Sequence, residues 1–339
     1  MNLQENFPGR KELVDMKKIV KGLMMVAMLF VAITGINKID SQAKVVNKTV
    51  ASAVEGEKCT IYDIQNCLDE ALQNPSDQYV IKVPKGVYYL KGTERLHISS
   101  NTTLILKGVT FRRTKSSGVG AMILVGYPRN EVGKSASDGG GYTKGGYTRA
   151  HDIKIIGGTF NAGKEVKNVS TLCTFSHVKN ITIQDTTFCY KPKKKNPAHM
   201  IEFGASKNVI IKNCRFLGNK KMGEAVQIES AIKNVAGSDL MGKEDGTKTL
   251  NVRLSGCRFV DFEYAFGTNH GCAKDIYRKI SICNNSFEKI SKYAICTYNY
   301  SKATIKGNVV KKSGKRTFAS FVLKLGQKNS LIQSKNKVR

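Results

Sequence analysis

The chain has 339 residues and carries 55 Lys and Arg side chains against 26 Asp and Glu, which gives a formal net charge of +29 at pH 7. The positive electrostatic field of such a charge draws polyanions to the protein surface, unless the charge serves only to keep the protein soluble. Nucleic acid is not the expected partner, because the basic residues are spread along the whole chain and no aromatic–basic module of the RNA-binding type occurs. An acidic polysaccharide or an anionic cell wall fits the charge better.

The first 43 residues have the pattern of an export signal. Met16 is followed by two lysines, an apolar run extends from Gly22 to Ile36, and a short polar stretch ends at Ala43. A positive start, a short apolar core and a final small residue are typical of a secretory signal. We therefore expect residues 1–43 to be a signal peptide, and the mature chain to be secreted or at the cell surface without stable membrane insertion. An uncleaved anchor is the alternative.

Residues 44–75 are expected to form an N-terminal segment that ends in an amphipathic helix. The predicted helix has the sequence IYDIQNCLDEALQNP. The residues on its apolar stripe are Ile64, Cys67, Leu68 and Leu72. A repeat structure needs such an element, because its first repeat would otherwise expose an apolar end and open strand edges. We interpret this helix as a cap.

Six segments after the cap end with similar short sequence motifs, which we call the repeat phrases. They are LILKGVTF ending at Phe111, IKIIGGTF at Phe160, ITIQDTTF at Phe188, VIIKNCRF at Phe216, VRLSGCRF at Phe259 and ISICNNSF at Phe287. The spacings between their last residues are 49, 28, 28, 43 and 28, and a weaker copy, ATIKGNVV, ends at Val310. A fixed period with alternating apolar residues is the signature of a solenoid whose coils stack on each other.

Each phrase alternates apolar and polar residues with period two, which indicates a short strand. At about 3.3 Å per residue, one period holds about three short strands and three corners. We therefore predict an all-β fold, a right-handed parallel β-helix of about seven coils over residues 76–312, followed by an irregular basic tail over residues 313–339. Asn213, Asn285 and Asn308 are expected to occupy equivalent corners and to form a hydrogen-bonded ladder along the axis.

The chain contains nine cysteines and no CxxC metal spacing. Cys214, Cys257 and Cys283 lie in the repeat phrases near the expected inward face, where a free cysteine behaves as a small apolar residue. Cys59 and Cys67 are close together before the repeats and could form a bridge, or could both remain free. Structural zinc is not expected.

The order of these elements resembles the pectin-lyase-like superfamily of polysaccharide-active β-helix proteins. The resemblance covers residues from about 57 to 312 and rests on VIKVPKGVYYLKG, LHISSNTTLILKGVTF, GGTFNAG and the repeated KNVIIKNCRF phrases. It implies the β-helix fold. The superfamily includes lyases, hydrolases, esterases and noncatalytic tailspikes, so the resemblance does not choose a reaction. GGTFNAG is similar to a segment of the polygalacturonases, but the further motifs of that family have no counterparts in this sequence.

Two glutamates in successive coils are the first candidate site residues. HMIEFGASKN and EAVQIESAIKN align on their Ile-Glu pairs, which places Glu202 and Glu229 27 residues, or one coil, apart. Thr174 occupies the equivalent place one coil earlier. If the apolar residues of these strands point inward, Glu202, Gln227 and Glu229 point to solvent. Two carboxylates side by side are costly unless they bind a cation, share a proton or meet basic neighbours.

One interpretation of this cluster is a lyase site. Glu202 and Glu229 would hold Ca²⁺ together with Gln227, or would neutralise a uronate carboxylate directly. Lys233 or Arg253 would then remove the proton next to that carboxylate. Calcium is therefore the candidate cofactor, with the two glutamates as its ligands.

A hydrolase site is the second interpretation, in which the same two glutamates act as acid and nucleophile of a retaining mechanism and Glu224 is a third carboxylate. His199 and His270 fall in the flanking coils and add titratable groups, and Asn269 precedes the second histidine. The third interpretation is a solvated polar ladder without chemistry.

The sequence thus predicts a secreted, monomeric β-helix protein that cleaves an acidic, uronate-containing polysaccharide by lyase or hydrolase chemistry. The alternative is a noncatalytic carbohydrate-binding or adhesin-type β-helix at the cell surface. The residues expected to act in catalysis are Glu202, Glu229, His199 and His270. The residues expected to contact the substrate are Gln227, Lys233, Arg253, Glu224 and Asn269.

Overall fold

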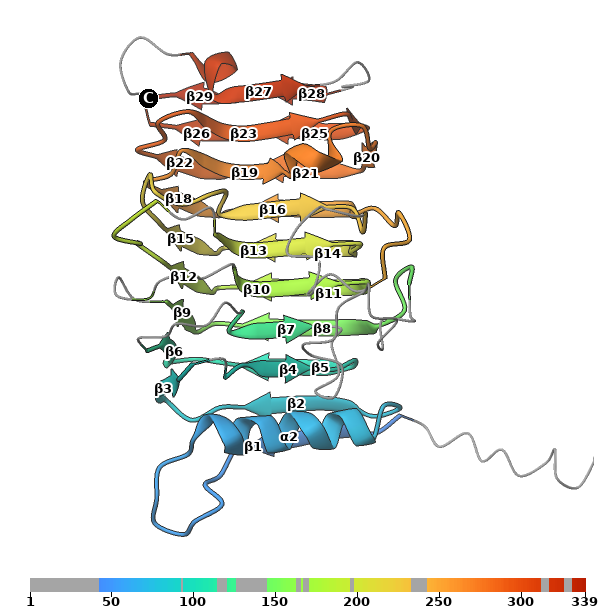
Figure 1. The fold of residues 1–339 in the computed structure, drawn as a ribbon, viewed down its shortest axis with the longest axis vertical. Coiled ribbons are helices and arrows are strands. Elements are labelled where there is room, and N and C mark those ends of the chain that lie inside the picture. Colours follow the sequence, from blue (N-terminus) through green and yellow to red (C-terminus); the bar gives the residue numbers. More distant parts are fainter. Residues whose placement is uncertain are drawn as a thin grey trace, which may run out of the picture. The chain divides into compact units, whose positions relative to one another are not determined.

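A computed structural model describes residues 43–92, 94–114, 121–125, 145–162, 166, 171–195, 198–232, 243–311, 317–325 and 331–339. The expected signal peptide lies outside these residues, so it stays a prediction. The residues from Val45 onward form one compact unit of the chain. Three parallel sheets, which we call A, B and C, make up this unit (Figure 1).

The sheets contain ten, nine and eight strands. Sheet A consists of β1 (Val45–Thr49), β2 (Gln78–Lys82), β5 (Thr102–Ile105), β8 (Ala150–Ile156), β11 (Val178–Gln184), β14 (Lys207–Lys212), β17 (Leu250–Ser255), β21 (Ile280–Cys283), β25 (Ala303–Lys306) and β28 (Leu331–Ser334). Sheet B consists of β3 (Gly86–Leu90), β6 (Val109–Arg113), β9 (Thr159–Asn161), β12 (Thr187–Cys189), β15 (Arg215–Leu217), β18 (Arg258–Val260), β22 (Ser286–Glu288), β26 (Val309–Val310) and β29 (Lys337–Val338).

Sheet C consists of β4 (Leu96–Ile98), β7 (Ile123–Val125), β10 (Thr171–Ser176), β13 (His199–Gly204), β16 (Val226–Glu229), β19 (Tyr264–Thr268), β23 (Tyr293–Tyr298) and β27 (Val322–Leu325). A short pair joins β20 (Tyr277–Arg278) to β24 (Tyr300–Ser301), and two single-turn helices are η4 (His270–Cys272) and η5 (Phe318–Phe321). The chain visits the three sheets in turn, and each strand pairs in parallel with strands of the adjacent coils. The predicted right-handed parallel β-helix is confirmed.

The solenoid is longer than the sequence predicts. The sheets have eight to ten strands instead of about seven coils, because strands with weaker phrases join both ends. Residues 313–339 are not simply an irregular tail, since β27, β28 and β29 extend all three sheets there. Their strands pair with β23, β25 and β26 through the same parallel register as the coils before them.

The closing phenylalanines of the repeat phrases form one column through the core. The rings that stack in succession are those of Phe111, Phe160, Phe188, Phe216, Phe259 and Phe287, with neighbouring ring centroids 4.6 to 5.4 Å apart. All six side chains are fully buried. The repeat spacing in the sequence therefore corresponds to one turn of the solenoid, and longer spacings contain inserted residues.

The predicted asparagine ladder exists at one buried corner. Asn285 Nδ2 donates to Asn308 Oδ1 at 3.0 Å, and Asn308 Nδ2 donates to Asn336 Oδ1 at 3.1 Å. Asn213 does not belong to this ladder. It lies one position earlier in its coil, with a left-handed φ of 55°, and Cys214 occupies the ladder position.

Helix α2 (Ile61–Gln73) lies against β2, β3 and β4 at one end of the solenoid, as expected for a cap (Figure 1). It begins with a capping box, in which Thr60 and Asp63 satisfy each other's backbone N–H groups. Its buried apolar residues are Ile61, Ile64, Leu68 and Ala71, whereas Leu72 is 45% exposed and is not on the packed stripe. Cys59 and Cys67 are both free thiols, so the possible bridge between them is absent.

Candidate functional site

The candidate glutamates lie on the outward side of sheet C. In β13 and β16 the side chains of Ile201, Phe203 and Ile228 pack into the core, so Glu202 and Glu229 alternate to the other side. The assumed inward and outward directions are therefore right.

The predicted alignment of the two glutamates is wrong by two residues. Glu202 is opposite Gln227, and Gly204 is opposite Glu229. Thr174 lies opposite Glu202 in the preceding coil, as expected. The error arises because the coil between β13 and β16 is shorter than the repeat, so aligning the Ile-Glu pairs shifts the register.

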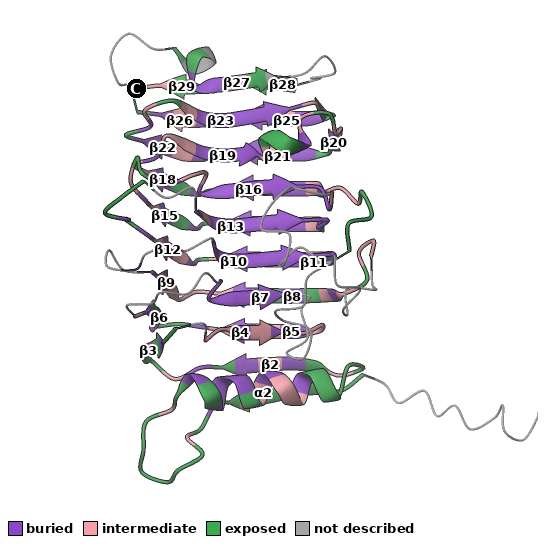
Figure 2. Cartoon of the chain, in the orientation of Figure 1, coloured by how far each residue is buried: buried purple, intermediate pink, exposed green. Residues whose placement is uncertain are grey.

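The outward side of these strands is buried, not solvated. Glu202 is 6% exposed, Gln227 is 5% exposed and Glu229 is fully buried. Figure 2 shows that most of sheet C is buried, since its strands from β7 to β23 are largely coloured as buried. Strand alternation reveals which side a residue faces, but it does not reveal what covers that side.

Burial makes the two carboxyl groups behave as a pair. Burial raises the pKa of Glu229 well above its usual value, and the adjacent Glu202 carboxyl raises it further. The pKa of Glu202 is also raised by burial, although His199 opposes this. Asn269 Nδ2 donates to Glu229 Oε1 at 2.7 Å, and Glu229 Oε2 has no hydrogen-bond partner among the described residues. A proton shared between the two glutamates removes the repulsion that two buried carboxylates would have.

Glu224 forms the more accessible edge of the cluster. Its Oε2 lies 3.4 Å from His199 Nδ1, and Gln227 Nε2 donates to the same oxygen at 3.5 Å. Gly267 makes room for this carboxylate, because a Cβ at that position would lie only 2.8 Å from Glu224 Cγ. The structure thus brings Glu224, His199 and Gln227 together beside the buried glutamate pair.

His270 occupies the exposed end of the same surface and contacts a residue that the sequence analysis missed. His270 Nδ1 lies 3.0 Å from the hydroxyl of Tyr298, on the next strand of the sheet. Burial raises the pKa of Tyr298 to about 12. The position of Tyr298 in the segment YAICTY, one coil after Asn269, could have predicted its place beside the cluster. This segment contains no acidic residue, however, so it does not stand out as a candidate site.

Of two further expected substrate contacts, one lies away from the cluster and the other is not among the described residues. Arg253 is exposed on β17 of sheet A, opposite Ile210, and therefore faces away from sheet C. Lys233 lies outside the described residues. Neither can be assigned the role of the base beside Glu202.

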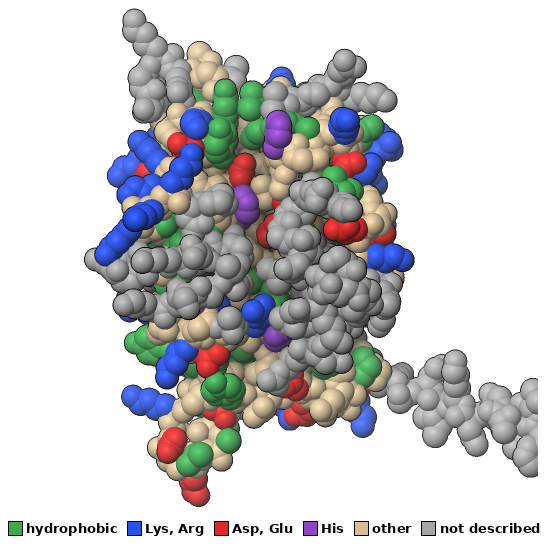
Figure 3. Space-filling view, viewed as in Figure 1, with side chains coloured by type: hydrophobic (Ala, Val, Ile, Leu, Met, Phe, Trp, Pro, Cys, Tyr) green, Lys and Arg blue, Asp and Glu red, His purple; other side chains and the backbone are tan. Residues whose placement is uncertain are grey.

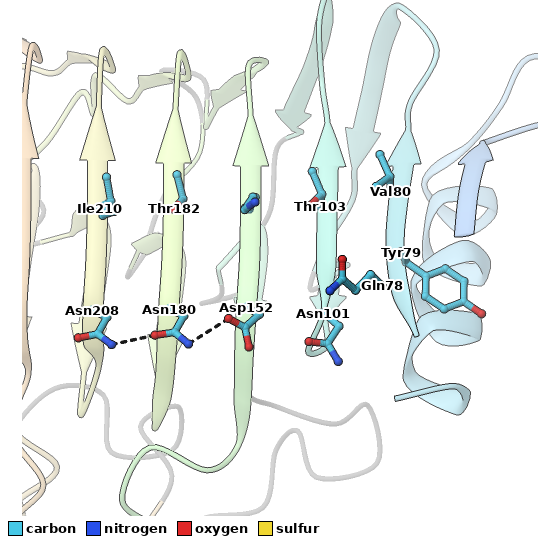
Figure 4. Close-up of a pocket in the computed structure, with 11 residues that line it drawn as sticks. Gln78, Tyr79, Val80, Asn101, Thr103, Asp152, Asn180, Thr182, Asn208 and Ile210 are labelled. Carbon is cyan, nitrogen blue, oxygen red and sulfur yellow. Dashed lines mark hydrogen bonds between the residues drawn. The ribbon is translucent and has the colours of Figure 1, made fainter. Parts of the chain in front are cut away.

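The outer face of sheet A, which carries Arg253, contains an open groove of about 530 Å³ over β2, β5, β8, β11 and β14. Figure 4 shows a row of left-handed corner residues there, in which Asn208 donates to Asn180 and Asn180 donates to Asp152. Asn251 extends the row by donating to Asn208 at 2.7 Å. Since these amides bond mainly to each other, the row is a structural ladder of the kind that Asn and Asp allow at positive φ.

The calcium interpretation gains no support from the described residues. No group of three or more His, Cys, Asp or Glu side chains in them comes together as a metal site. Burial instead raises the pKa values of Glu202 and Glu229, which favours protonated carboxyls over the carboxylates that bind a cation. In the described part of the chain, no helix is long and apolar enough to span a membrane.

The fold and the site together define a parallel β-helix with the pectin-lyase-like fold and an acidic cluster on sheet C. No family model matches the sequence. Plasmin and fibronectin-binding protein A of Streptococcus pneumoniae (strain ATCC BAA-255 / R6) is 26% identical over 282 residues, which are 72% of this chain and 36% of that protein. The chain therefore spans about a third of the length of this curated relative.

Two solved structures of that adhesin share the fold. The Streptococcus pneumoniae surface protein and adhesin PfbA superimposes with a TM-score of 0.61 at 21% identity, covering 79% of this chain and 67% of that one. A second crystal structure of PfbA gives a TM-score of 0.56 at 22% identity, covering 74% and 58%. At these identities the likeness concerns the fold.

Proposed function

We propose that this chain is a binding module of the adhesin type, exported and displayed at the cell surface, and that its targets are host proteins such as fibronectin and plasmin. The similarity to a plasmin and fibronectin-binding protein over 72% of the chain carries the proposal. The site geometry supports it, because two of the three glutamates expected to act on a substrate are buried. A long rigid solenoid also presents a wide surface to a protein partner.

Surface plasmon resonance with immobilised fibronectin, plasmin and serum albumin tests this proposal. The expected result is saturable binding to fibronectin or plasmin and none to albumin, at 0.15 M and again at 0.5 M NaCl. The higher salt concentration screens contacts that come only from the net positive charge. Binding no stronger than that to albumin on both targets would overturn the proposal.

Cleavage of an acidic polysaccharide is the second candidate function, and the Glu202–Glu224–Glu229 cluster favours it. A carboxyl with a raised pKa keeps its proton to a higher pH than usual, which favours its action as a general acid. Glu224 and His199, which are partly accessible, would then face the substrate.

Mass spectrometry of uronate-containing polysaccharides incubated with the chain tests the cleavage. Unsaturated fragments indicate a lyase and hydrated fragments indicate a hydrolase. Glu229→Gln should abolish either product, because the amide keeps the shape of the side chain but donates no acidic proton. An absence of fragments from the unchanged chain would leave only the binding function.

A further inference from the structure

Six lysines gather on two neighbouring turns that connect sheet B to sheet C. The turn after β12 contributes Lys191, Lys193, Lys194 and Lys195, and the turn after β15 contributes Lys220 and Lys221. All six side chains are exposed. Figure 3 shows Lys and Arg side chains projecting along the left margin of the molecule, the side on which β12 and β15 lie in Figure 1. We call this surface the lysine shelf.

The two turns are fixed to each other by hydrogen bonds. Asn219 Nδ2 donates to the carbonyl of Pro192 at 2.9 Å, and Lys221 N donates to Asn219 Oδ1 at 3.1 Å. At the start of the turns, Tyr190 N donates to Leu217 O at 3.1 Å. Since adjacent coils are about 4.8 Å apart, the lysines form a compact array on a rigid support. The backbone that carries the lysines is therefore held in place, and Lys221 Nζ also donates to the carbonyl of Lys193.

The sequence of the two turns is basic. Residues 189–195 and 217–223 contain no Asp or Glu. The next coil ends the array, because Asp261 and Glu263 occupy its turn and Glu263 pairs with Lys292 at 3.0 Å. By contrast, β10, β13, β16 and β19 of sheet C contain no Lys or Arg, and the glutamate cluster lies there. An anionic polymer is thus attracted to the shelf, which is the more basic of the two surfaces.

We propose that the lysine shelf binds a linear sulfated glycan. Sulfate groups on such a chain are fixed, closely spaced anions, and ammonium groups on successive coils match them as point charges. The shelf has no exposed aromatic side chain, since Tyr190 is fully buried, and this lack of a stacking platform favours a glycan over single-stranded nucleic acid. The proposal goes beyond both candidate functions and requires neither of them.

Heparin is the probe, and two variants with the same net charge test the location. The shelf variant is Lys193→Ser/Lys194→Ser/Lys195→Ser/Lys220→Ser. The control variant, Lys107→Ser/Lys154→Ser/Lys179→Ser/Lys306→Ser, removes four exposed lysines from sheet A and its adjoining turn. Fluorescence anisotropy with labelled heparin at 0.15 M NaCl measures the affinity, and thermal melting checks that both variants fold.

We expect the shelf variant to bind heparin at least about tenfold more weakly, because four exposed ion contacts together contribute more than about 1.4 kcal/mol. The control variant should weaken binding by less than about threefold, since only screened long-range attraction is lost. Equal losses in both variants would assign the binding to overall charge and overturn the proposal. Displacement of heparin by duplex DNA at equal charge concentration would also overturn it.

The same variants separate this inference from the adhesin proposal. Fibronectin and plasmin binding should be measured on them in parallel. Loss of heparin binding with retained protein binding supports the shelf as a separate site. If the unchanged chain binds fibronectin or plasmin but not heparin, the inference fails and the adhesin proposal stands.

Discussion

At the scale of single residues, the burial of the Glu202–Glu229 pair decides its chemistry. Glu202, Glu229 and Gln227 do lie together, and alternation in the strands predicts their direction. Their burial could not be predicted, because it depends on what covers sheet C. Their register could not be predicted either, because one coil is shorter than the repeat. Burial then changes the chemistry, because it favours the protonated form of each carboxyl over the carboxylate form that binds cations.

The buried pair predicts a specific dependence of stability on pH. Burial raises the pKa of Glu229 in the folded state above the usual value of about 4.5, so the folded chain binds more protons than the unfolded chain above that pH. The free energy of unfolding must therefore fall as the pH rises from about 4.5 toward the folded-state pKa. Glu229→Gln, which cannot ionise at this position, should therefore lose less stability than the unchanged chain between pH 5 and pH 8.

Urea denaturation at several pH values measures this difference. Gln can still accept the hydrogen bond from Asn269, so the substitution preserves that contact. The exposed Glu57 provides the control, and Glu57→Gln should leave the pH profile unchanged. Parallel profiles for Glu229→Gln and the unchanged chain would show that Glu229 is ionised in the folded protein.

At the scale of elements, the strands and their stacking were predictable because identical contacts recur in every coil. The phenylalanine column is visible as a spacing in the sequence, and so is most of the asparagine ladder. The position of Asn213 was not predictable from adjacent asparagines alone. Both Asn284 and Asn285 follow the strand in their coil, and only the left-handed backbone at Asn284 distinguishes the corner from the ladder.

The ladder should be sensitive to substitution at its centre. Asn308 accepts hydrogen bonds from Asn285 and donates to Ile282 O at 2.8 Å, as well as to Asn336. Asn308→Ala leaves several of these buried partners unsatisfied, so we expect a loss of about 2 to 4 kcal/mol. Urea denaturation measures it. Asn47→Ala, at an exposed position on β1, should cost less than about 0.5 kcal/mol, and an equal cost at both sites would contradict the role of the ladder.

At the scale of the whole molecule, each coil contacts only its neighbours, so stability depends on position along the axis. Val226 and Val322 are equivalent inward residues, because each occupies the same register position of sheet C through Phe266 and Ile295. The strand of Val226 lies within the sheet, whereas β27 is its terminal strand. The two valines therefore provide a matched pair for comparing the interior with the end.

Val226→Ala should lower the free energy of unfolding by roughly 2 kcal/mol, because it leaves a cavity between two packed coils. Val322→Ala should cost less than about 1 kcal/mol, since β27 is packed on one side only. Thermal melting measures the global effect, and hydrogen exchange should show faster opening of β27 than of β16 in the unchanged chain. Equal costs and equal protection would mean that the solenoid unfolds as one unit.

The phenylalanine column also has a consequence for the evolution of this molecule. Because each ring inside the column contacts a phenylalanine ring on both sides, a duplicated 28-residue unit can be inserted between two such coils and will meet the same surfaces on both sides. Gene segments of this length can therefore be gained or lost without a new core being required. The turns do not pack in this column, so their sequences can change without disturbing it. Natural selection can therefore change which side chains the turns expose. The number of coils sets the length of the surface that exposes them.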